Sequence, residues 1–140
     1  MQDDQKSYHH GNLVPALIAA TVEIIDERGV DGLSVREVAK RAGVSAGAPF
    51  RHFSSKAALL TAVAEQAMER LVAAVQDAQA EGDDGDPLGQ IERIGQGYLA
   101  WAVQNPTHFQ IVSSRSLIDF QASDVLRQMN DGIRLRMVDL

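Results

Sequence analysis

The sequence predicts an all-α protein, and three observations support this fold class. Hydrophobic residues make up 45% of the 140 positions, which is typical of a folded chain and not of a disordered one. Apolar residues recur at helical spacing almost throughout, whereas no alternating run exceeds a few residues. Glycines, prolines and capping residues then divide the chain into segments of helical length.

The first helix is expected to begin after Asn12, a good N-cap residue, and to end at Gly29. Pro15 falls in its first turn, where amide hydrogens lack helical partners in any case. The side chains at helical spacing along this segment are Val14, Leu17, Ile18, Thr21, Ile24 and Ile25.

Two short helices follow, in a helix-turn-helix pattern over about residues 34–53. Ser34 and Glu37 form a capping box at the start of the second helix. Gly43 ends that helix, because glycine takes a positive φ without a Cβ penalty. Ser45 is then placed to cap the third helix. Ala39 is small where two helices must cross closely, and the side chains expected in the small core are Val38, Ala42 and Val44.

The third helix, over residues 46–53, is expected to present a surface that suits the DNA major groove. Small residues at its start would let the backbone approach DNA, where free amides favour phosphate. Arg51 has the geometry for a bidentate contact to guanine, which contributes about 1–3 kcal/mol of discrimination. His52 and Lys56 are placed for phosphate contacts. The side chains expected to face outward are Ala46, Gly47, Ala48, Phe50, Arg51 and His52.

A long fourth helix is predicted from about Lys56 to Glu81, capped by Ser54 or Ser55. The clearest linker in the chain spans residues 81–87, which include two glycines, three aspartates and a proline. Asp86 can cap the next helix, whose apolar stripe is Leu88, Ile91, Ile94, Tyr98 and Trp101 with Ala102.

Asn105-Pro106 is expected to end the helix that follows the linker, before a short apolar piece from His108 to Val112. A last helix is predicted from about Ser123. Its apolar edge is Leu126, Met129, Ile133, Met137 and Leu140. Three glycines inside these helices are expected to mark close packing or bends: Gly95, Gly97 and Gly132.

Charge is unevenly distributed along a chain whose net charge is −6. Residues 1–60 carry seven basic and seven acidic side chains, whereas residues 61–140 carry six basic and twelve acidic ones. Residues 34–56 carry five basic groups and one acidic group. Such a basic island in an acidic protein favours a small surface that binds a polyanion.

Several classes of function are excluded or disfavoured. The chain has no cysteine, which removes disulfides, zinc ribbons, iron–sulfur clusters and thiol catalysis. The four histidines make no metal motif, and no nucleotide-binding loop or nucleophile motif occurs, so no enzyme, metal or cofactor is expected. Calcium binding at Asp83, Asp84 and Asp86 is disfavoured, because Gly85 is misplaced for an EF-hand. No apolar stretch could span a membrane and no signal segment is recognisable, so a cytoplasmic protein is expected.

The segment from Leu33 to Lys56, LSVREVAKRAGVSAGAPFRHFSSK, followed by Leu59-Leu60, closely resembles the DNA-binding domain of TetR/AcrR-type transcriptional regulators. The resemblance covers about residues 10–70, and residues 71–140 would form a helical regulatory and dimerisation region. The start YHHGNL at residues 8–13 resembles one subset of the family, and the stretch from Gly97 to Phe109 resembles the regulatory domain of that subset.

This resemblance implies a homodimer that binds a palindromic DNA operator, represses transcription and responds to a small-molecule effector. The implied mechanism is movement of the fourth helix when the effector binds. Carried over residue by residue, the DNA contacts fall on Ser34, Arg36, Ser45, Ala46, Gly47, Ala48, Phe50, Arg51, His52 and Lys56. The residues expected to line an effector cavity are Met68, Ile94, Tyr98, Trp101 and Phe109, which are otherwise ordinary core residues.

The sequence departs from the family pattern at four points. Ala46 stands where many relatives have lysine, and Phe50 replaces a tyrosine whose hydroxyl would bind phosphate. Pro49 biases Ala48 away from the helical region, so a distorted or 3₁₀-like start of the third helix is expected. Relatives continue through further long helices beyond the position of Leu140, so the regulatory region is expected to be incomplete relative to the family.

An alternative interpretation is a small helical protein-interaction module that pairs with another chain and does not bind DNA. The apolar edge of the last helix favours it, although the same residues would serve as ordinary core. Salt discriminates between the two, because DNA binding weakens steeply as salt rises and hydrophobic pairing does not.

Overall fold

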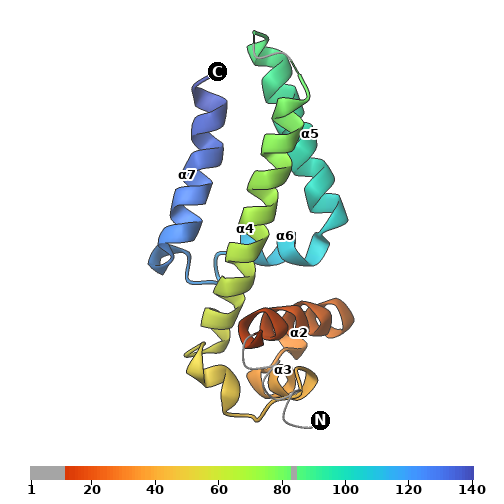
Figure 1. The fold of residues 1–140 in the computed structure, drawn as a ribbon, viewed down its shortest axis with the longest axis vertical. Coiled ribbons are helices and arrows are strands. Elements are labelled where there is room, and N and C mark those ends of the chain that lie inside the picture. The colour runs from red at the N-terminus through yellow and green to blue at the C-terminus, as the bar shows by residue number, and fades with distance from the viewer. Residues whose placement is uncertain (1–11, 83–84) are drawn as a thin grey trace. The chain divides into compact units, whose positions relative to one another are not determined.

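The protein is all-helical throughout the part of the chain that the computed structural model describes, residues 12–82 and 85–140 (Figure 1). Within these ranges no helix combines the length and apolar character that a membrane span requires. The α-helices are α2 (Leu13–Arg28), α3 (Val35–Arg41), α4 (Lys56–Ala80), α5 (Pro87–Gln104), α6 (Pro106–Ser113) and α7 (Asp124–Val138). The 3₁₀ turns are η1 (Val30–Gly32), η2 (Ala48–Arg51) and η3 (Phe120–Ala122).

The chain divides into two compact units, and the division falls inside α4. Unit 1 is Met1–Val63 and unit 2 is Ala64–Leu140. Asp83 and Asp84 of the predicted linker lie outside the described residues, and so do Tyr8, His9 and His10 of the YHHGNL start.

The core of unit 1 is formed by α2, α3 and the first turns of α4. Its fully buried side chains include Leu17, Ile24, Val38 and Leu59. Thr21 is also buried, and its hydroxyl donates to the carbonyl of Leu17 at 2.7 Å, so this buried polar group has a hydrogen-bond partner. Burying each large aliphatic side chain stabilises the fold by about 1.5–3 kcal/mol.

Side-chain caps set most of the helix starts, and four have the expected geometry. The hydroxyls of Ser34, Ser55 and Ser123 and the carboxylate of Asp86 each accept an amide hydrogen bond from three residues on, all at 3.1 Å. Ser55, and not Ser54, is therefore the residue that caps α4. Asn12 makes no side-chain cap to α2, which corrects the expectation for that residue.

The turn after α3 has the expected glycine geometry. Gly43 has a φ of 74°, and its amide donates to the carbonyl of Lys40 at 3.2 Å. The amide of Val44 donates to Ala39 at 3.0 Å, which satisfies a further carbonyl at the end of α3.

The third helix is shorter than predicted and is 3₁₀ throughout. In place of an α-helix over residues 46–53, only η2 (Ala48–Arg51) is regular, and the side chain of Ser45 does not cap it. Pro49 explains the difference, because it cannot donate the amide that an α-helix starting here would need and disfavours the helical region at Ala48. The amide of Ala48 instead closes a tight turn onto the Ser45 carbonyl at 3.0 Å.

Unit 2 packs the rest of α4 with α5, α6 and α7 around a core that includes Leu71, Val75, Ile94, Ile111 and Leu126. Helices α5 and α6 are separated at Asn105-Pro106 as predicted, and α7 begins after Ser123 as predicted.

Helices α4 and α5 approach closely at Gly97. A Cβ added there would lie 2.7 Å from the Cβ of Ala78 and 3.2 Å from the carbonyl oxygen of Ala74. The other two glycines behave differently, since a Cβ at Gly95 or Gly132 would meet nothing within 4 Å. Close packing therefore explains only one of the three.

Polar side chains bridge the helices of unit 2 away from its apolar core. Nε2 of the buried His108 lies 3.4 Å from both Gln66 Oε1 and Arg70 Nη1. The buried Ser123 hydroxyl donates to Glu65 Oε1 at 2.8 Å. Further bridges join Gln79 to Gln90 at 2.9 Å and Arg136 to Gln79 at 3.1 Å.

Candidate nucleic-acid interface

The exposed side of η2 carries most of the residues predicted to contact DNA. Arg51 and His52 are exposed, and so are Ser45, Ala46 and Gly47 in the turn before η2. Phe50 has 56% of its surface exposed, and it is the one large hydrophobic side chain in the described part of unit 1 to be so exposed. The geometry thus brings an aromatic ring, a guanidinium and an imidazole onto consecutive positions.

Ala48 is a correction, because it was predicted to face outward and is only 8% exposed. Pro49 beside it is fully buried, and Phe53 is also buried. These three side chains anchor η2 to the core of unit 1, so its remaining residues are directed outward. Any contact of Ala48 with DNA would therefore have to come through its backbone.

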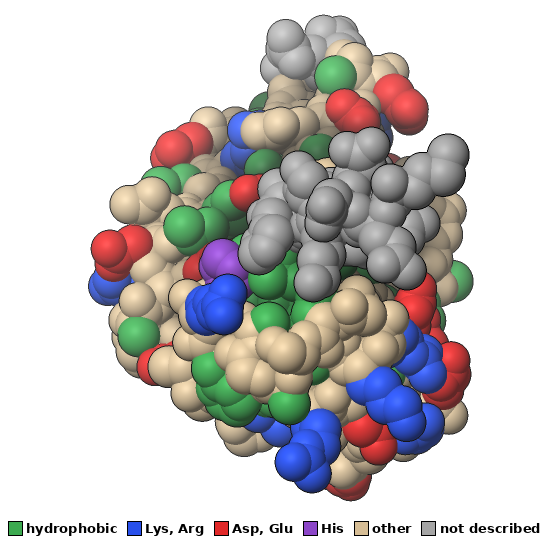
Figure 2. All heavy atoms as spheres, turned by 60° about the horizontal axis from the view of Figure 1, so that its bottom comes forward, with side chains coloured by type: hydrophobic (Ala, Val, Ile, Leu, Met, Phe, Trp, Pro, Cys, Tyr) green, Lys and Arg blue, Asp and Glu red, His purple; other side chains and the backbone are tan. Residues whose placement is uncertain are grey.

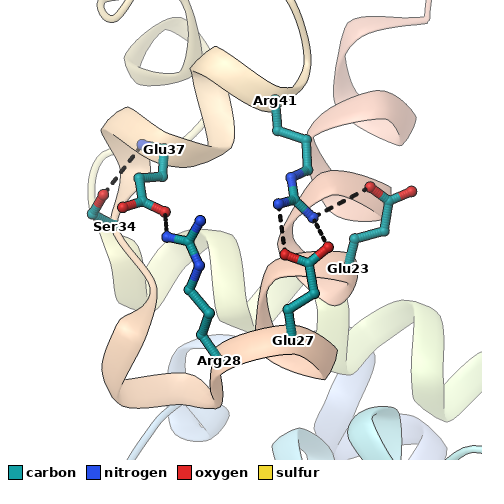
Figure 3. A network of polar contacts seen from close by, with 6 residues as sticks. All are labelled: Glu23, Glu27, Arg28, Ser34, Glu37 and Arg41. Atoms are coloured by element: carbon teal, nitrogen blue, oxygen red, sulfur yellow. Dashed lines mark hydrogen bonds and ion pairs between the residues drawn. The ribbon is translucent and has the colours of Figure 1, made fainter.

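Part of the basic island is neutralised inside unit 1. Arg41 donates from both terminal nitrogens to the two carboxylate oxygens of Glu27, each at 2.7 Å, and lies 3.8 Å from Glu23 (Figure 3). The hydrogen bond from Arg41 lowers the pKa of Glu27, and the same bond raises the pKa of Arg41. This guanidinium holds α3 against α2 and is already engaged.

A second ion pair joins the same two helices. Arg28, at the end of α2, pairs with the carboxylate of Glu37, in the first turn of α3 (Figure 3). Glu37 was predicted to complete a capping box with Ser34. The amide of Glu37 does donate to the Ser34 hydroxyl, as in that box, but its carboxylate pairs with Arg28.

Within the described residues, three other cations of the basic island make neither an ion pair nor a side-chain hydrogen bond: Arg36, Lys40 and Arg51. All three are exposed, and Arg36 lies in the first turn of α3 next to the exposed Ser34. Figure 2 shows this end of the molecule, where some Lys and Arg side chains lie beside acidic ones and others do not. The unpaired cations are those available to a polyanion.

Lys56 differs from both groups of cations, because its partner is a backbone carbonyl and not an acid. It begins α4, is half-buried, and its Nζ donates to the carbonyl of Val30 at 3.3 Å. An ammonium group has three donors, so this bond leaves capacity for a phosphate. The lysine therefore positions η1 against α4 and keeps the role predicted for it open.

The predicted effector residues separate into two groups. A cavity of about 210 Å³ in unit 2 is bordered by Met68 and Tyr98, as predicted. Ile94 and Trp101 do not border it and are buried, at 2% and 6% exposure, in the core. Phe109 is outside the lining as well, but its ring packs edge-on against Tyr98 with centroids 6.1 Å apart. The remaining lining residues are Leu71, Val112, Ser113, Arg115, Phe120, Asn130 and Ile133.

Seven residues of this lining were not predicted from the sequence, among them Arg115, Phe120 and Asn130. Two of them lie in the irregular segment between α6 and α7, for which no periodicity places a side chain.

Comparison with known proteins identifies relatives of this chain. Residues 17–63 match the family model described as bacterial regulatory proteins, tetR family. The chain is 38% identical over 81 residues to the HTH-type transcriptional regulator BetI of Stenotrophomonas maltophilia (strain R551-3), a match that covers 58% of this chain. The chain spans only 41% of the length of that curated relative.

Two solved structures extend the likeness over most of the chain. One is a TetR-family transcriptional regulator from Streptomyces coelicolor, 30% identical, with a TM-score of 0.61 over 86% of this chain and 67% of that one. The other is a protein with unknown function from Rhodococcus sp. RHA1, 30% identical, with a TM-score of 0.74 over 90% of this chain and 64% of that one. The helix-turn-helix unit, the all-helical fold and these matches together show that the chain belongs to the TetR family.

Proposed function

We propose that the protein is a sequence-specific DNA-binding transcriptional regulator of the repressor type. The observation that carries the proposal is the exposed side of η2, where Phe50, Arg51 and His52 lie together on an anchored turn. Curated relatives include proteins named as an HTH-type transcriptional regulator and as a tetracycline repressor protein, which supports a regulatory role.

Each part of the interface has a role in this proposal. Arg51 reads a base edge, and Phe50 contacts the sugars or a thymine methyl group without the phosphate bond that a tyrosine would make. Backbone amides in the tight turn contact phosphate, since their small side chains leave room: Ser45, Ala46, Gly47 and Ala48. The phosphate contacts that fix the register come from Ser34, Arg36, His52 and Lys56.

We propose further that two copies act together on a palindromic operator. The support lies in α5, which carries exposed apolar side chains at helical spacing. Leu88 and Val103 are each 80% exposed, and Leu99 is 65% exposed. Pairing of such faces between two copies would bury them and would present two copies of η2 to one DNA duplex.

The regulatory mechanism proposed here is a population shift. A dimer on its operator excludes polymerase, and an effector bound in unit 2 stabilises a conformation that does not fit the operator. The cavity bordered by Met68 and Tyr98 supports an effector site.

Selection from a random DNA library tests the function directly. The purified 140-residue chain is mixed with the library at moderate salt, and the bound fraction is sequenced. An enriched palindrome is the expected result and would show sequence-specific binding by a dimer. A single enriched half-site would support sequence-specific binding but reject the proposed dimer. No enrichment by a chain shown to be folded would reject the regulator proposal.

A second candidate function is a helical interaction module that pairs with another chain and does not bind DNA. Exposed apolar side chains near the end of α7 favour it, among them Leu135, Met137 and Val138. Leu126, which was predicted on this apolar edge, is instead fully buried as ordinary core. Binding measured over a range of salt separates the candidates, because only phosphate contacts give a steep decrease with salt.

A further inference from the structure

The cavity in unit 2 has a polarity that restricts what it can bind. Its apolar walls come from α4, α6 and α7, where Met68, Leu71, Val112 and Ile133 line it. Among the residues that the structure describes, no aspartate or glutamate borders it. An organic cation would therefore find no counter-charge here.

Three polar groups on the cavity wall keep hydrogen-bonding capacity for a ligand. These are the guanidinium of Arg115, the hydroxyl of Tyr98 and the side-chain amide of Asn130. Among the described residues, no hydrogen bond or ion pair engages any of the three. All three can donate, and Arg115 can only donate. The Ser113 hydroxyl differs, because it already donates to the carbonyl of Phe109 at 2.6 Å.

Arg115 is held in place by an aromatic ring and not by an acid. Its Cζ lies 3.3 Å from the centroid of the Phe120 ring, and both residues border the cavity. Stacking on the ring face leaves the N–H groups at the edge of the guanidinium free for a planar acceptor. A carboxylate matches this fork with two parallel hydrogen bonds.

Cavity size limits the rest of the ligand. A cavity of about 150 Å³ holds one benzene molecule, so the 210 Å³ found here accommodates a body of about eight to ten non-hydrogen atoms. One cation on the wall matches one negative charge, and a phosphate dianion would keep an uncompensated charge.

We propose that this cavity binds a small organic monoanion, an aromatic or short-chain carboxylate whose carboxylate pairs with Arg115 while its apolar body packs between α4 and α7. The inference rests on the proposed function for its role, because it names the chemical class of the effector. The binding itself depends only on the cavity and its polar groups.

Calorimetric titration of the 140-residue chain with three probes of nearly equal size tests the proposal: benzoate, benzamide and benzylamine. Benzoate is expected to bind at least about tenfold more tightly than the neutral and the cationic probe, because it alone gains a charge-assisted bidentate contact. Equal affinity for benzoate and benzamide, a preference for benzylamine, or no binding of millimolar benzoate would each overturn the proposal.

Variants locate the binding site. Arg115→Gln should weaken benzoate binding about tenfold and leave benzamide unchanged, whereas Arg115→Lys should retain part of the preference. Arg134→Gln, on the exposed side of α7, is the matched control and should change neither. Ile133→Trp should fill the cavity and abolish binding of all probes, with helical content checked by circular dichroism. Unchanged benzoate affinity in Arg115→Gln would exclude this site.

The design keeps the two proposals separate. Titration is performed without DNA, and library selection is performed without benzoate. A chain that selects an operator but does not bind benzoate rejects the effector class alone. A chain that binds benzoate through Arg115 but selects no DNA rejects the regulator function alone.

Discussion

The two units of the molecule leave very different surfaces to solvent. In the described part of unit 1, Phe50 is the single large hydrophobic side chain that is strongly exposed, and it lies at the candidate interface. Unit 2 exposes a set of them, on α5 and α7: Leu88, Ile91, Leu99, Val103, Val125, Leu135, Met137 and Val138. The difference teaches that the described part of unit 1 exposes little apolar surface apart from its proposed contact, whereas unit 2 has apolar faces suited to a protein partner.

Polar contacts differ between the units as well. Unit 1 joins α2 to α3 through exposed ion pairs, Arg41 with Glu27 and Arg28 with Glu37. Unit 2 joins its helices through partly buried hydrogen bonds, such as Ser123 with Glu65. Exposed ion pairs contribute little to stability, so unit 1 depends on its apolar core, while the buried bonds of unit 2 also fix how its helices align.

The largest expected effect comes from truncating a buried side chain in the core of unit 1. Leu17→Ala should destabilise that unit by about 2–5 kcal/mol, because Leu17 is fully buried and leaves a cavity. Hydrogen exchange should then speed up in α2 and α3 and stay unchanged in α5 and α7. The reciprocal variant Leu126→Ala should do the opposite. Equal loss of protection in both units would show one cooperative fold and would remove the basis of the comparison.

The second-largest expected effect is a loss of sequence discrimination in Arg51→Ala. Discrimination between the selected operator and random DNA should fall by about 1–3 kcal/mol, with a smaller loss of nonspecific affinity. Arg134→Ala removes an exposed arginine from unit 2 and serves as the matched control. Fluorescence anisotropy with both DNAs measures the effect. An equal loss on both DNAs would make Arg51 a phosphate contact only.

A charge placed on the apolar face of unit 2 tests the partner surface. Leu99→Glu should raise the dimer dissociation constant at least about tenfold without loss of folding, since pairing would bury an unpaired charge. Gln104→Glu adds a charge at another exposed position of α5 and should have less effect. Sedimentation equilibrium gives the constants. If both variants dimerise like the original chain, α5 is not the interface.

A serine caps the start of a helix in each unit, Ser34 at α3 and Ser123 at α7, so the same substitution can be compared between the units. Ser34→Ala should cost about 1 kcal/mol, the usual contribution of an exposed cap. Ser123→Ala should cost about 1 kcal/mol more, because its buried hydroxyl also donates to Glu65. Urea unfolding measures both. Equal costs would mean that the bond to Glu65 adds nothing to the cap.

The smallest effect is the pH dependence of the exposed ion pair in unit 1. The hydrogen bond from Arg41 lowers the pKa of Glu27 below its ordinary value of 4.5. The pair therefore stabilises the fold above that value, and its contribution is lost as pH falls through the lowered folded pKa. Glu27→Gln should be slightly less stable than the original chain at neutral pH and equally stable in acid. A difference in urea midpoint that persists in acid would contradict this origin.

Local signals predicted the helices well, since a cap or a breaker acts within one turn. Ser34, Asp86 and the Asn105-Pro106 step each did what its residue type favours. Pro49 was recognised as a distortion, but its effect extended over the whole third helix, because a segment this short has no further turns to recover α-geometry.

Contacts between helices were harder to predict. The bond from Arg41 to Glu27 joins residues 14 positions apart and depends on how α2 and α3 cross, which neither sequence segment specifies. Ile94 and Trp101 of the predicted apolar stripe are buried, whereas Leu88 and Ile91 of the same stripe are exposed. Helical spacing alone also does not show which buried side chains border a cavity.

The close approach of α4 and α5 at Gly97 gives the cavity walls unequal compliance. A methyl group added at Gly97 would meet the backbone of α4, so the two helices are in close contact there. Such tight packing resists movement of one helix along the other. Tyr98, the next residue, is thereby fixed on a stiff wall. Another part of the cavity wall is formed by Arg115 and Phe120, in a segment with only one short 3₁₀ turn. Admission of a ligand would therefore deform that wall, so the entry rate should depend on the Arg115–Phe120 stack.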